Sequence, residues 1–176
     1  MALAHAILAA LIEQPCSGYD LAKQFDGSVG FFWKASHQQI YRELTKLEDQ
    51  SWLSSESIRQ EGRPDKKLYY VTELGKNALR DWIAQPAELR SIKDELLVKL
   101  FAGYLVPKEK MLAELEQHRS QHLERLTEYQ KIEQQYFQNP QTLPIERKYQ
   151  YLTLRSGLRY ETDWLAWCEE VMQFIG

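Results

Sequence analysis

The sequence predicts a mainly α protein with one small β-hairpin. Apolar residues recur at helical spacing along most of the 176 residues, which indicates amphipathic helices. One pair of β-rich segments, separated by a polar turn, interrupts this pattern. The pattern changes near Pro86, where short segments broken by Gly, Asp and Ser give way to long helical ones. We therefore expect two domains, at residues 1–86 and 87–176.

Three helices are expected at the start of the first domain. Residues 3–13 place four aliphatic side chains on one helical face, and residues 19–25 have the pattern of a second, shorter helix. Ser36 and Gln39 have the spacing of a capping box, which marks the start of a third helix at 37–50. The apolar face of this third helix consists of Ile40, Leu44 and Leu47.

A hairpin and a fourth helix complete the first domain. The sequence predicts strands at 52–59 and 68–72, joined by the polar turn 60–67, and a helix at 72–84. The resulting order of helix, helix, helix, strand, turn, strand and helix is that of an N-terminal winged helix-turn-helix. A two-stranded hairpin is marginally stable alone, so we expect it to pack against the helices.

The second domain is predicted to be a C-terminal helical dimerisation domain. Its helices are expected at about 89–101, 107–138 and 144–175, the last with a wide aromatic face. This aromatic face is better explained by burial between two subunits than by burial within one small helical arm. The apolar heptad positions of the middle helix have polar interruptions, so a freestanding coiled coil is not expected. The predicted interface comprises Leu112, Leu115, Leu126, Tyr129, Trp164, Trp167 and Val171.

The composition and charge of the chain exclude several classes of function. The net charge is −3, with −1 in residues 1–86 and −2 in residues 87–176, so a nucleic-acid surface must be a local patch. No segment has the length and apolarity to cross a bilayer, and the N-terminal run lacks the basic start of a signal peptide, so we expect a cytoplasmic protein. The two cysteines, Cys16 and Cys168, have no CxxC spacing and predict neither a disulfide framework nor a zinc site.

Catalysis finds little support in the sequence. His118 and His122 have the i, i+4 spacing of metal ligands, which leaves a metal-dependent enzyme as a third alternative, but no third ligand is evident. No phosphate-binding glycine motif and no Ser/His/Asp pattern is present. We therefore expect no catalytic residue, no metal and no cofactor.

A candidate DNA-binding face lies on the third helix. When its apolar face points inward, Gln38, Arg42 and Thr45 point outward, Gln39 and Lys46 flank them and Tyr41 lies at the edge. These side chains form hydrogen bonds with base edges and phosphates, and Ser36 starts the same helix. The hairpin adds a basic wing suited to the phosphate backbone or the minor groove. The candidate DNA contacts are Ser36, Gln38, Gln39, Tyr41, Arg42, Thr45, Lys46, Arg59, Arg63, Lys66 and Lys67.

Several motifs resemble the PadR family of bacterial transcriptional regulators. They are SGYDL at 17–21, FWKASHQQIYREL at 32–44 followed by Lys46 and Leu47, and YYVTELG at 69–75. The segments DELLVK at 94–99 and ETDWL at 161–165 are similar to the helical second domain of that family. The resemblance covers nearly the whole chain.

The resemblance implies a homodimer that binds double-stranded DNA at a palindromic operator and represses transcription until a small-molecule effector releases it. It also implies that Tyr41 contacts DNA. The segment around Trp33 is similar to that of phenolic-acid repressors, so a phenolic acid is the first candidate effector. The alternatives are a virulence-type transcriptional activator and a winged-helix module for protein–protein contact, the latter because the first domain is nearly neutral.

Overall fold

The computed structural model describes residues 2–26, 29, 33–59, 65–89 and 93–176. The chain divides into two compact units, Met1–Leu89 and Arg90–Gly176, which are described separately below.

Four helices form most of the first unit: α1 (Ala2–Glu13), α2 (Gly18–Asp26), α3 (His37–Asp49) and α4 (Glu73–Ile83). All four lie close to the predicted positions. Helix α1 contacts each of the other three, and the expected apolar face of α3 is fully buried. The side chains at the centre of this core are Ile7, Leu8, Leu11, Leu21, Ile40, Leu44 and Leu47.

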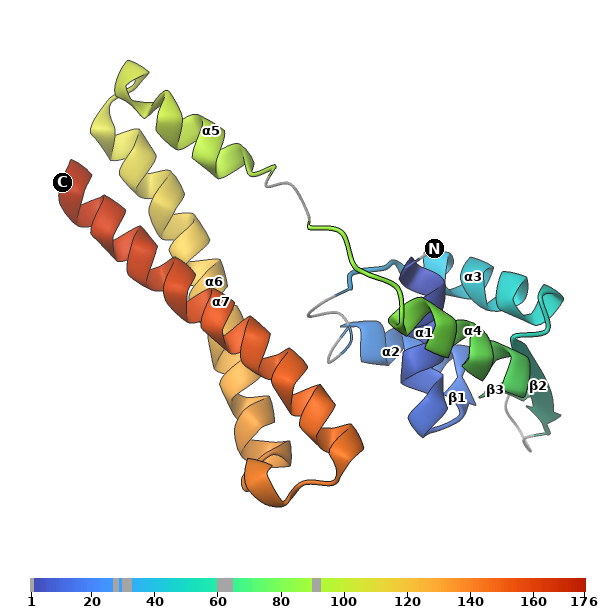
Figure 1. Ribbon diagram of the computed structural model, residues 1–176. Coiled ribbons are helices and arrows are strands. Elements are labelled where there is room, and N and C mark those ends of the chain that lie inside the picture. The colour runs from blue at the N-terminus through green and yellow to red at the C-terminus, as the bar shows by residue number, and fades with distance from the viewer. Residues whose placement is uncertain (1, 27–28, 30–32, 60–64, 90–92) are drawn as a thin grey trace. The chain divides into compact units, whose positions relative to one another are not determined.

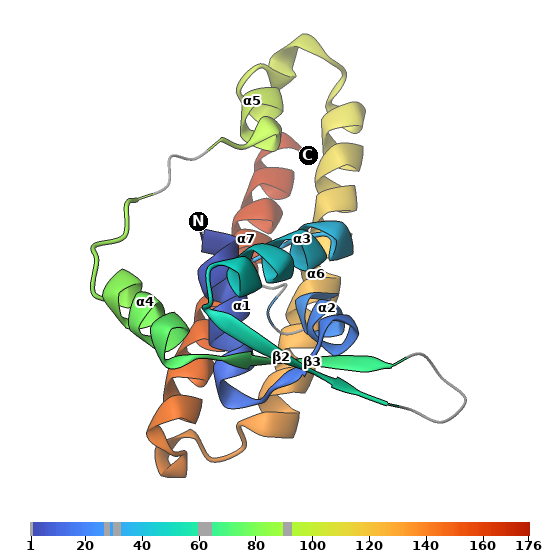
Figure 2. The ribbon, with the colours of Figure 1, turned by 90° about the vertical axis from the view of Figure 1, so that its right-hand side faces the viewer.

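A small antiparallel sheet lies beside these helices (Figure 2). Strands β2 (Leu53–Ile58) and β3 (Lys66–Val71) form the predicted hairpin, with Leu53 opposite Val71 and Ile58 opposite Lys66. Strand β3 begins two residues earlier than predicted, because Lys66 and Lys67, expected in the turn, pair with Ile58 and Ser57 of β2. A third strand, β1 (Cys16–Ser17), pairs with the other edge of β3. We did not predict β1 because two residues after Pro15 carry no alternation from which a strand can be recognised.

Thr72 joins the hairpin to α4. Its hydroxyl accepts a hydrogen bond from the Gly75 amide at 3.1 Å, which caps the helix, and donates one to the Ser51 carbonyl at 2.8 Å. A Cβ atom on Gly75 would lie 2.3 Å from the Trp52 carbonyl oxygen, so a side chain at this position would force α4 away from the residue that precedes β2.

The second unit is helical in its described residues. It contains α5 (Glu95–Phe101), a 3-10 turn at Gly103–Leu105, the long helix α6 (Lys108–Tyr136), a second 3-10 turn at Pro140–Thr142, and α7 (Ile145–Ile175). Helices α6 and α7 lie side by side along their length as an antiparallel hairpin (Figure 1).

The first helix of this unit is shorter than the sequence predicts. Asp94 caps α5 by accepting a hydrogen bond from the Leu96 amide at 2.9 Å, and Leu89 is fully exposed before it. The prediction of a helix from Leu89 onward is therefore wrong for its first residues, and Ile92 lies outside the described residues. An N-cap aspartate stops a helix from extending backward, because its backbone adopts a non-helical conformation.

The core of the second unit has an apolar part and a polar part. Leu96, Met111, Leu115 and Cys168 form the apolar part. Between α6 and α7, the Glu161 carboxylate is 2% exposed and binds both His122 and Arg125, the latter at 3.2 Å. The His122 ring stacks on Trp164 with 3.7 Å between ring centroids.

Both cysteines are free and buried. Burial, and secondarily the negative charge of Asp20, raises the pKa of the Cys16 thiol, and burial raises that of Cys168. A raised pKa keeps a thiol protonated and poorly nucleophilic at neutral pH.

We predict that Thr72→Ala lowers the free energy of unfolding by about 1–2 kcal/mol, because the Gly75 amide loses its cap. Urea denaturation followed by tryptophan fluorescence measures this. Thr72→Ser keeps the hydroxyl and is expected to retain most of the stability. Equal stability of the alanine variant and wild type would contradict this role.

We also predict that Glu161→Ala destabilises the second unit by about 1–3 kcal/mol, because the largely buried His122 ring and the partly exposed Arg125 guanidinium lose their carboxylate partner. Thermal unfolding followed by circular dichroism checks this. The control is Glu170→Ala on the exposed side of the same helix, which is expected to change stability by less than about 0.5 kcal/mol.

Candidate nucleic-acid interface

The outward face of α3 is the centre of the candidate interface. Because Ile40, Leu44 and Leu47 are buried, the helix presents its opposite side to solvent. Within the described part of the chain, neither the Gln38 amide nor the Arg42 guanidinium has an intramolecular polar partner. Both groups are therefore available to a ligand. The predicted contacts exposed on this helix are Gln38, Gln39, Tyr41, Arg42, Thr45 and Lys46.

Two predicted contacts, Ser36 and Gln39, are used to begin the helix. The Ser36 hydroxyl accepts a hydrogen bond from the Gln39 amide at 3.3 Å, and the Gln39 side-chain oxygen accepts one from the Ser36 amide at 2.8 Å. This capping box confirms the predicted start of the helix. It also fixes the side chain of Gln39, which leaves Gln38 as the freer amide on this turn.

Other residues on this face have local partners. The Thr45 hydroxyl donates to the Tyr41 carbonyl at 3.2 Å, and the Lys46 ammonium lies 3.5 Å from the Glu43 carboxylate. The Tyr41 ring packs on Gly18 of α2, where an added Cβ would lie 2.6 Å from a ring carbon. Glycine at this position therefore lets the Tyr41 ring lie close against α2, with 45% of the residue still exposed.

The hairpin supplies the second part of the candidate interface. Figure 2 shows β2 and β3 extending beyond the helices of the first unit. Arg59 is exposed directly after β2, whereas the predicted contact Arg63 lies outside the described residues. Lys66 and Lys67 begin β3, and both ammonium groups are held by carboxylates.

The partners of these two lysines come from the neighbouring helices. The Lys66 Nζ atom lies 2.8 Å from Asp20 Oδ2 on α2, and the Lys67 Nζ atom lies 2.8 Å from Glu48 Oε2 on α3. Hydrogen bonds from Lys66 and Ser17 lower the pKa of Asp20. Burial acts to raise the pKa of Glu48, but hydrogen bonds from Lys67 and Ser55 outweigh it and lower that pKa. The hydrogen bond to Glu48 raises the pKa of Lys67. Asp20, Glu48 and Lys67 therefore stay charged at neutral pH.

Sequence reasoning missed these two carboxylates. Glu48 and Lys67 are 19 residues apart, and only the folded hairpin brings them together. It also missed Tyr19 and Lys23 of α2, both exposed, with the Lys23 ammonium 4.6 Å from the centre of the Tyr19 ring. Their i, i+4 spacing on a predicted helix was the signal that could have identified them.

The predicted dimer-interface residues divide into two groups. Leu115 and Tyr129 are buried within the single chain, at 0% and 2% exposure, so their side chains belong to the core rather than to a surface that a partner could cover. Leu112, Leu126, Trp164, Trp167 and Val171 are half-buried. The prediction omitted apolar side chains that are more exposed than these five. Some lie on α5 and on the turn after it, and others lie on the predicted aromatic face of α7. They include Val98, Phe101, Tyr104, Leu105, Tyr149, Leu152, Tyr160 and Phe174.

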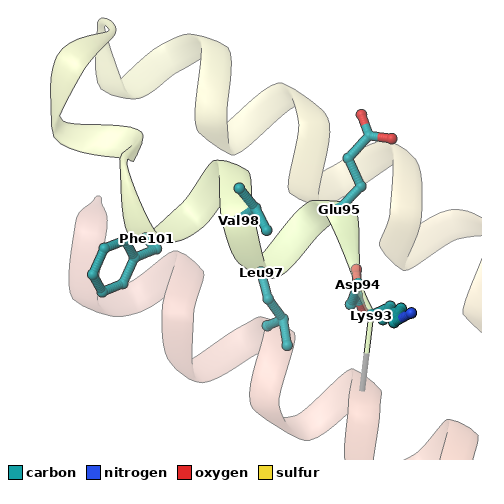
Figure 3. Close-up of a pocket in the computed structure, with 6 residues that line it drawn as sticks. All are labelled: Lys93, Asp94, Glu95, Leu97, Val98 and Phe101. Carbon is teal, nitrogen blue, oxygen red and sulfur yellow. The ribbon is translucent and has the colours of Figure 1, made fainter. Parts of the chain in front are cut away.

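The second unit also has an open pocket along α5 (Figure 3). It is lined by Lys93, Asp94, Glu95, Leu97, Val98 and Phe101. The described residues contain no group of three or more His, Cys, Asp or Glu side chains placed to hold a metal ion, and no helix among them is long and apolar enough to span a membrane. His122 instead binds Glu161, which accounts for this member of the candidate metal pair.

The chain matches two protein-family models. Residues 7–81 match the transcriptional regulator PadR-like family, and residues 92–175 match the C-terminal region of virulence activator alpha. A probable transcriptional regulator of Mycobacterium tuberculosis is 38% identical over 185 residues, which covers 99% of this chain and 98% of that protein.

Solved structures resemble both units. Bacillus subtilis PadR bound to operator DNA superimposes with a TM-score of 0.87 at 26% identity, with all of both chains covered. The same protein bound to p-coumaric acid gives a TM-score of 0.79 at 26% identity, with 99% of each chain covered. The Vibrio cholerae virulence activator AphA gives a TM-score of 0.79 at 34% identity, covering 98% of this chain and 97% of that one.

Proposed function

The chain belongs to the PadR-like family of transcriptional regulators, and we propose that it binds operator DNA as a homodimer through α3 and the β2–β3 hairpin. The observation that carries this proposal is the exposed, polar face of α3, in which Gln38 and Arg42 have no intramolecular polar partner among the described residues. A short helix followed by such a helix is how a helix-turn-helix places hydrogen-bonding side chains in the major groove. Bacillus subtilis PadR, which shares the fold, has been solved with operator DNA.

The roles of the interface residues follow from their positions. Gln38 lies in the first turn of α3, where recognition helices meet base edges, and Arg42 lies one turn later on the same face. Arg42 can bind guanine O6 and N7 with two hydrogen bonds or bind a phosphate. Arg59, Lys66 and Lys67 of the hairpin meet the phosphate backbone, which positions the protein without reading sequence.

The second unit serves dimerisation in this proposal. Exposed apolar side chains such as Leu152 and Tyr160 of α7 would be covered by a second copy. A dimer also gives two recognition helices, which read the two halves of a palindromic operator.

We infer that the protein acts as a repressor released by a small-molecule effector, with a phenolic acid as the first candidate. Support comes from Bacillus subtilis PadR, a negative regulator 27% identical over 98% of this chain and solved with p-coumaric acid. Activation is the second candidate function, favoured by the 34% identity with AphA.

The proposal also covers location and chemistry. A regulator that binds bacterial DNA acts in the cytoplasm and has no catalytic step, so neither an enzyme activity nor a cofactor is part of the proposal.

We predict that Arg42→Ala weakens binding to the DNA upstream of the protein's own gene about 10- to 100-fold, because one base or phosphate contact is lost. Fluorescence anisotropy with a labelled duplex measures the affinity, and sedimentation shows that the dimer is intact. Lys131→Ala removes an equal charge from an exposed site on α6 and is expected to bind as wild type does. Unchanged binding in both Arg42→Ala and the double variant Lys66→Ala/Lys67→Ala would refute the proposed interface.

For the dimer, we predict that Leu152→Glu shifts the protein from dimer to monomer, because a carboxylate would be buried in the apolar contact. Sedimentation velocity over a range of protein concentrations detects the shift. Leu152→Met keeps the apolar contact and should remain dimeric. A Leu152→Glu protein that sediments as wild type would exclude this face of α7 from the interface.

A further inference from the structure

The two described lysines of the hairpin are already paired in the protein without DNA. Lys66 binds Asp20 and Lys67 binds Glu48, each pair with 2.8 Å between nitrogen and oxygen. The carboxylates come from α2, which contacts β3, and from α3, which contacts β2. Both lysine side chains are partly exposed, at 39% and 46%, so a phosphate could reach either ammonium group by displacing its carboxylate.

The position of Glu48 is unfavourable for a carboxylate unless a cation is nearby. It lies in the last turn of α3, where the helix dipole places partial negative charge. Each of its two oxygens is bound by a different strand: Oε1 accepts from the Ser55 hydroxyl of β2 at 2.6 Å, and Oε2 accepts from Lys67 of β3 at 2.8 Å. The geometry thus holds a carboxylate against a lysine that the proposed function assigns to phosphate.

We propose that Glu48 and Asp20 are internal competitors for DNA phosphate, which weaken the sequence-independent part of DNA binding. The occupant that they exclude is the phosphodiester backbone of duplex DNA. This inference rests on the proposed function and deepens it, because it assigns a regulatory role to two residues of the same interface.

The mechanism is an exchange of anions. When a free lysine binds a phosphate, the DNA releases a counterion, and this release drives binding. When a paired lysine does so, the displaced carboxylate stays beside the DNA without its partner, and its negative charge offsets the positive charge that the lysine brings. The net release of counterions at that contact is close to zero. The affinity for DNA and its salt dependence are therefore both smaller than the number of lysines in the hairpin suggests.

The test compares the full-length wild type with Glu48→Gln on two duplexes, the protein's own upstream DNA and a scrambled duplex of the same length and composition. Anisotropy titrations at several salt concentrations give the affinity and the slope of log K against log salt. Glu48→Gln is expected to bind the scrambled duplex on the order of 3- to 10-fold more tightly near 0.1 M salt, with a slope steeper by about one. Asp20→Asn tests the same idea independently at Lys66 and keeps an acceptor for the Ser17 hydroxyl.

Two controls separate this role from others. Glu73→Gln removes an equal charge from an exposed pair with Lys76 on α4, and should leave the slope unchanged. Ser55→Ala removes the hydrogen bond between β2 and Glu48 but keeps the Lys67 pair, and should also leave the slope unchanged.

The outcomes are distinguishable. If wild type binds its upstream DNA but neither Glu48→Gln nor Asp20→Asn steepens the slope, the inference is overturned and the proposed function stands. If Glu48→Gln and Ser55→Ala both weaken binding to both duplexes, Glu48 positions the hairpin instead and the inference is likewise overturned. If wild type binds neither duplex, the proposed function itself fails.

Discussion

Burial of one face of α3 is the constraint on which the rest of the first unit depends. Ile40, Leu44 and Leu47 have no exposed surface, and rotating the helix about its axis would expose them. Full burial of one such side chain contributes about 1.5–3 kcal/mol, so three of them fix the rotation of the helix strongly. The direction in which Gln38 and Arg42 point is therefore a consequence of core packing. The Gln38 and Arg42 side chains themselves need contribute nothing to the fold.

The hairpin is positioned by a different set of contacts. The backbone amide of Thr72 bonds to the Trp52 carbonyl at 3.0 Å, and its hydroxyl caps α4, so the strands and that helix are fixed together. Glu48 then connects the end of α3 to both strands of the hairpin. This carboxylate is thus one of the groups that link α3 to the hairpin, and it places a negative charge beside Lys67.

The sequence was a good guide wherever structure is set by neighbours along the chain. The α3 capping box depends on residues three apart, and the apolar faces of α1 and α3 depend on spacings within one helix, so periodicity located them. Contacts between distant segments were not predictable in this way. The Lys66–Asp20 and Lys67–Glu48 pairs and the His122–Glu161 pair each depend on how folded elements meet. For the same reason, the sequence predicts Leu115 and Tyr129 at a dimer interface, whereas both are buried within the single chain. The spacing of apolar residues along a helix does not show whether they are covered by the same chain or by a partner.

A nearly neutral first unit is compatible with DNA binding for physical reasons that these contacts make clear. Bulk charge governs the sequence-independent attraction to DNA, whereas hydrogen bonds from side chains such as Gln38 and Arg42 can discriminate between bases. If Asp20 and Glu48 compete with phosphate as proposed, the pairing of Lys66 and Lys67 weakens the attraction of one copy of the chain for an arbitrary duplex. In a dimer, binding of the first recognition helix raises the effective concentration of the second at its half-site, so two modest contacts combine on a palindrome but not on random DNA. In the proposed function, weak charge in the first unit and dimerisation through the second are therefore complementary parts of one means of selecting an operator.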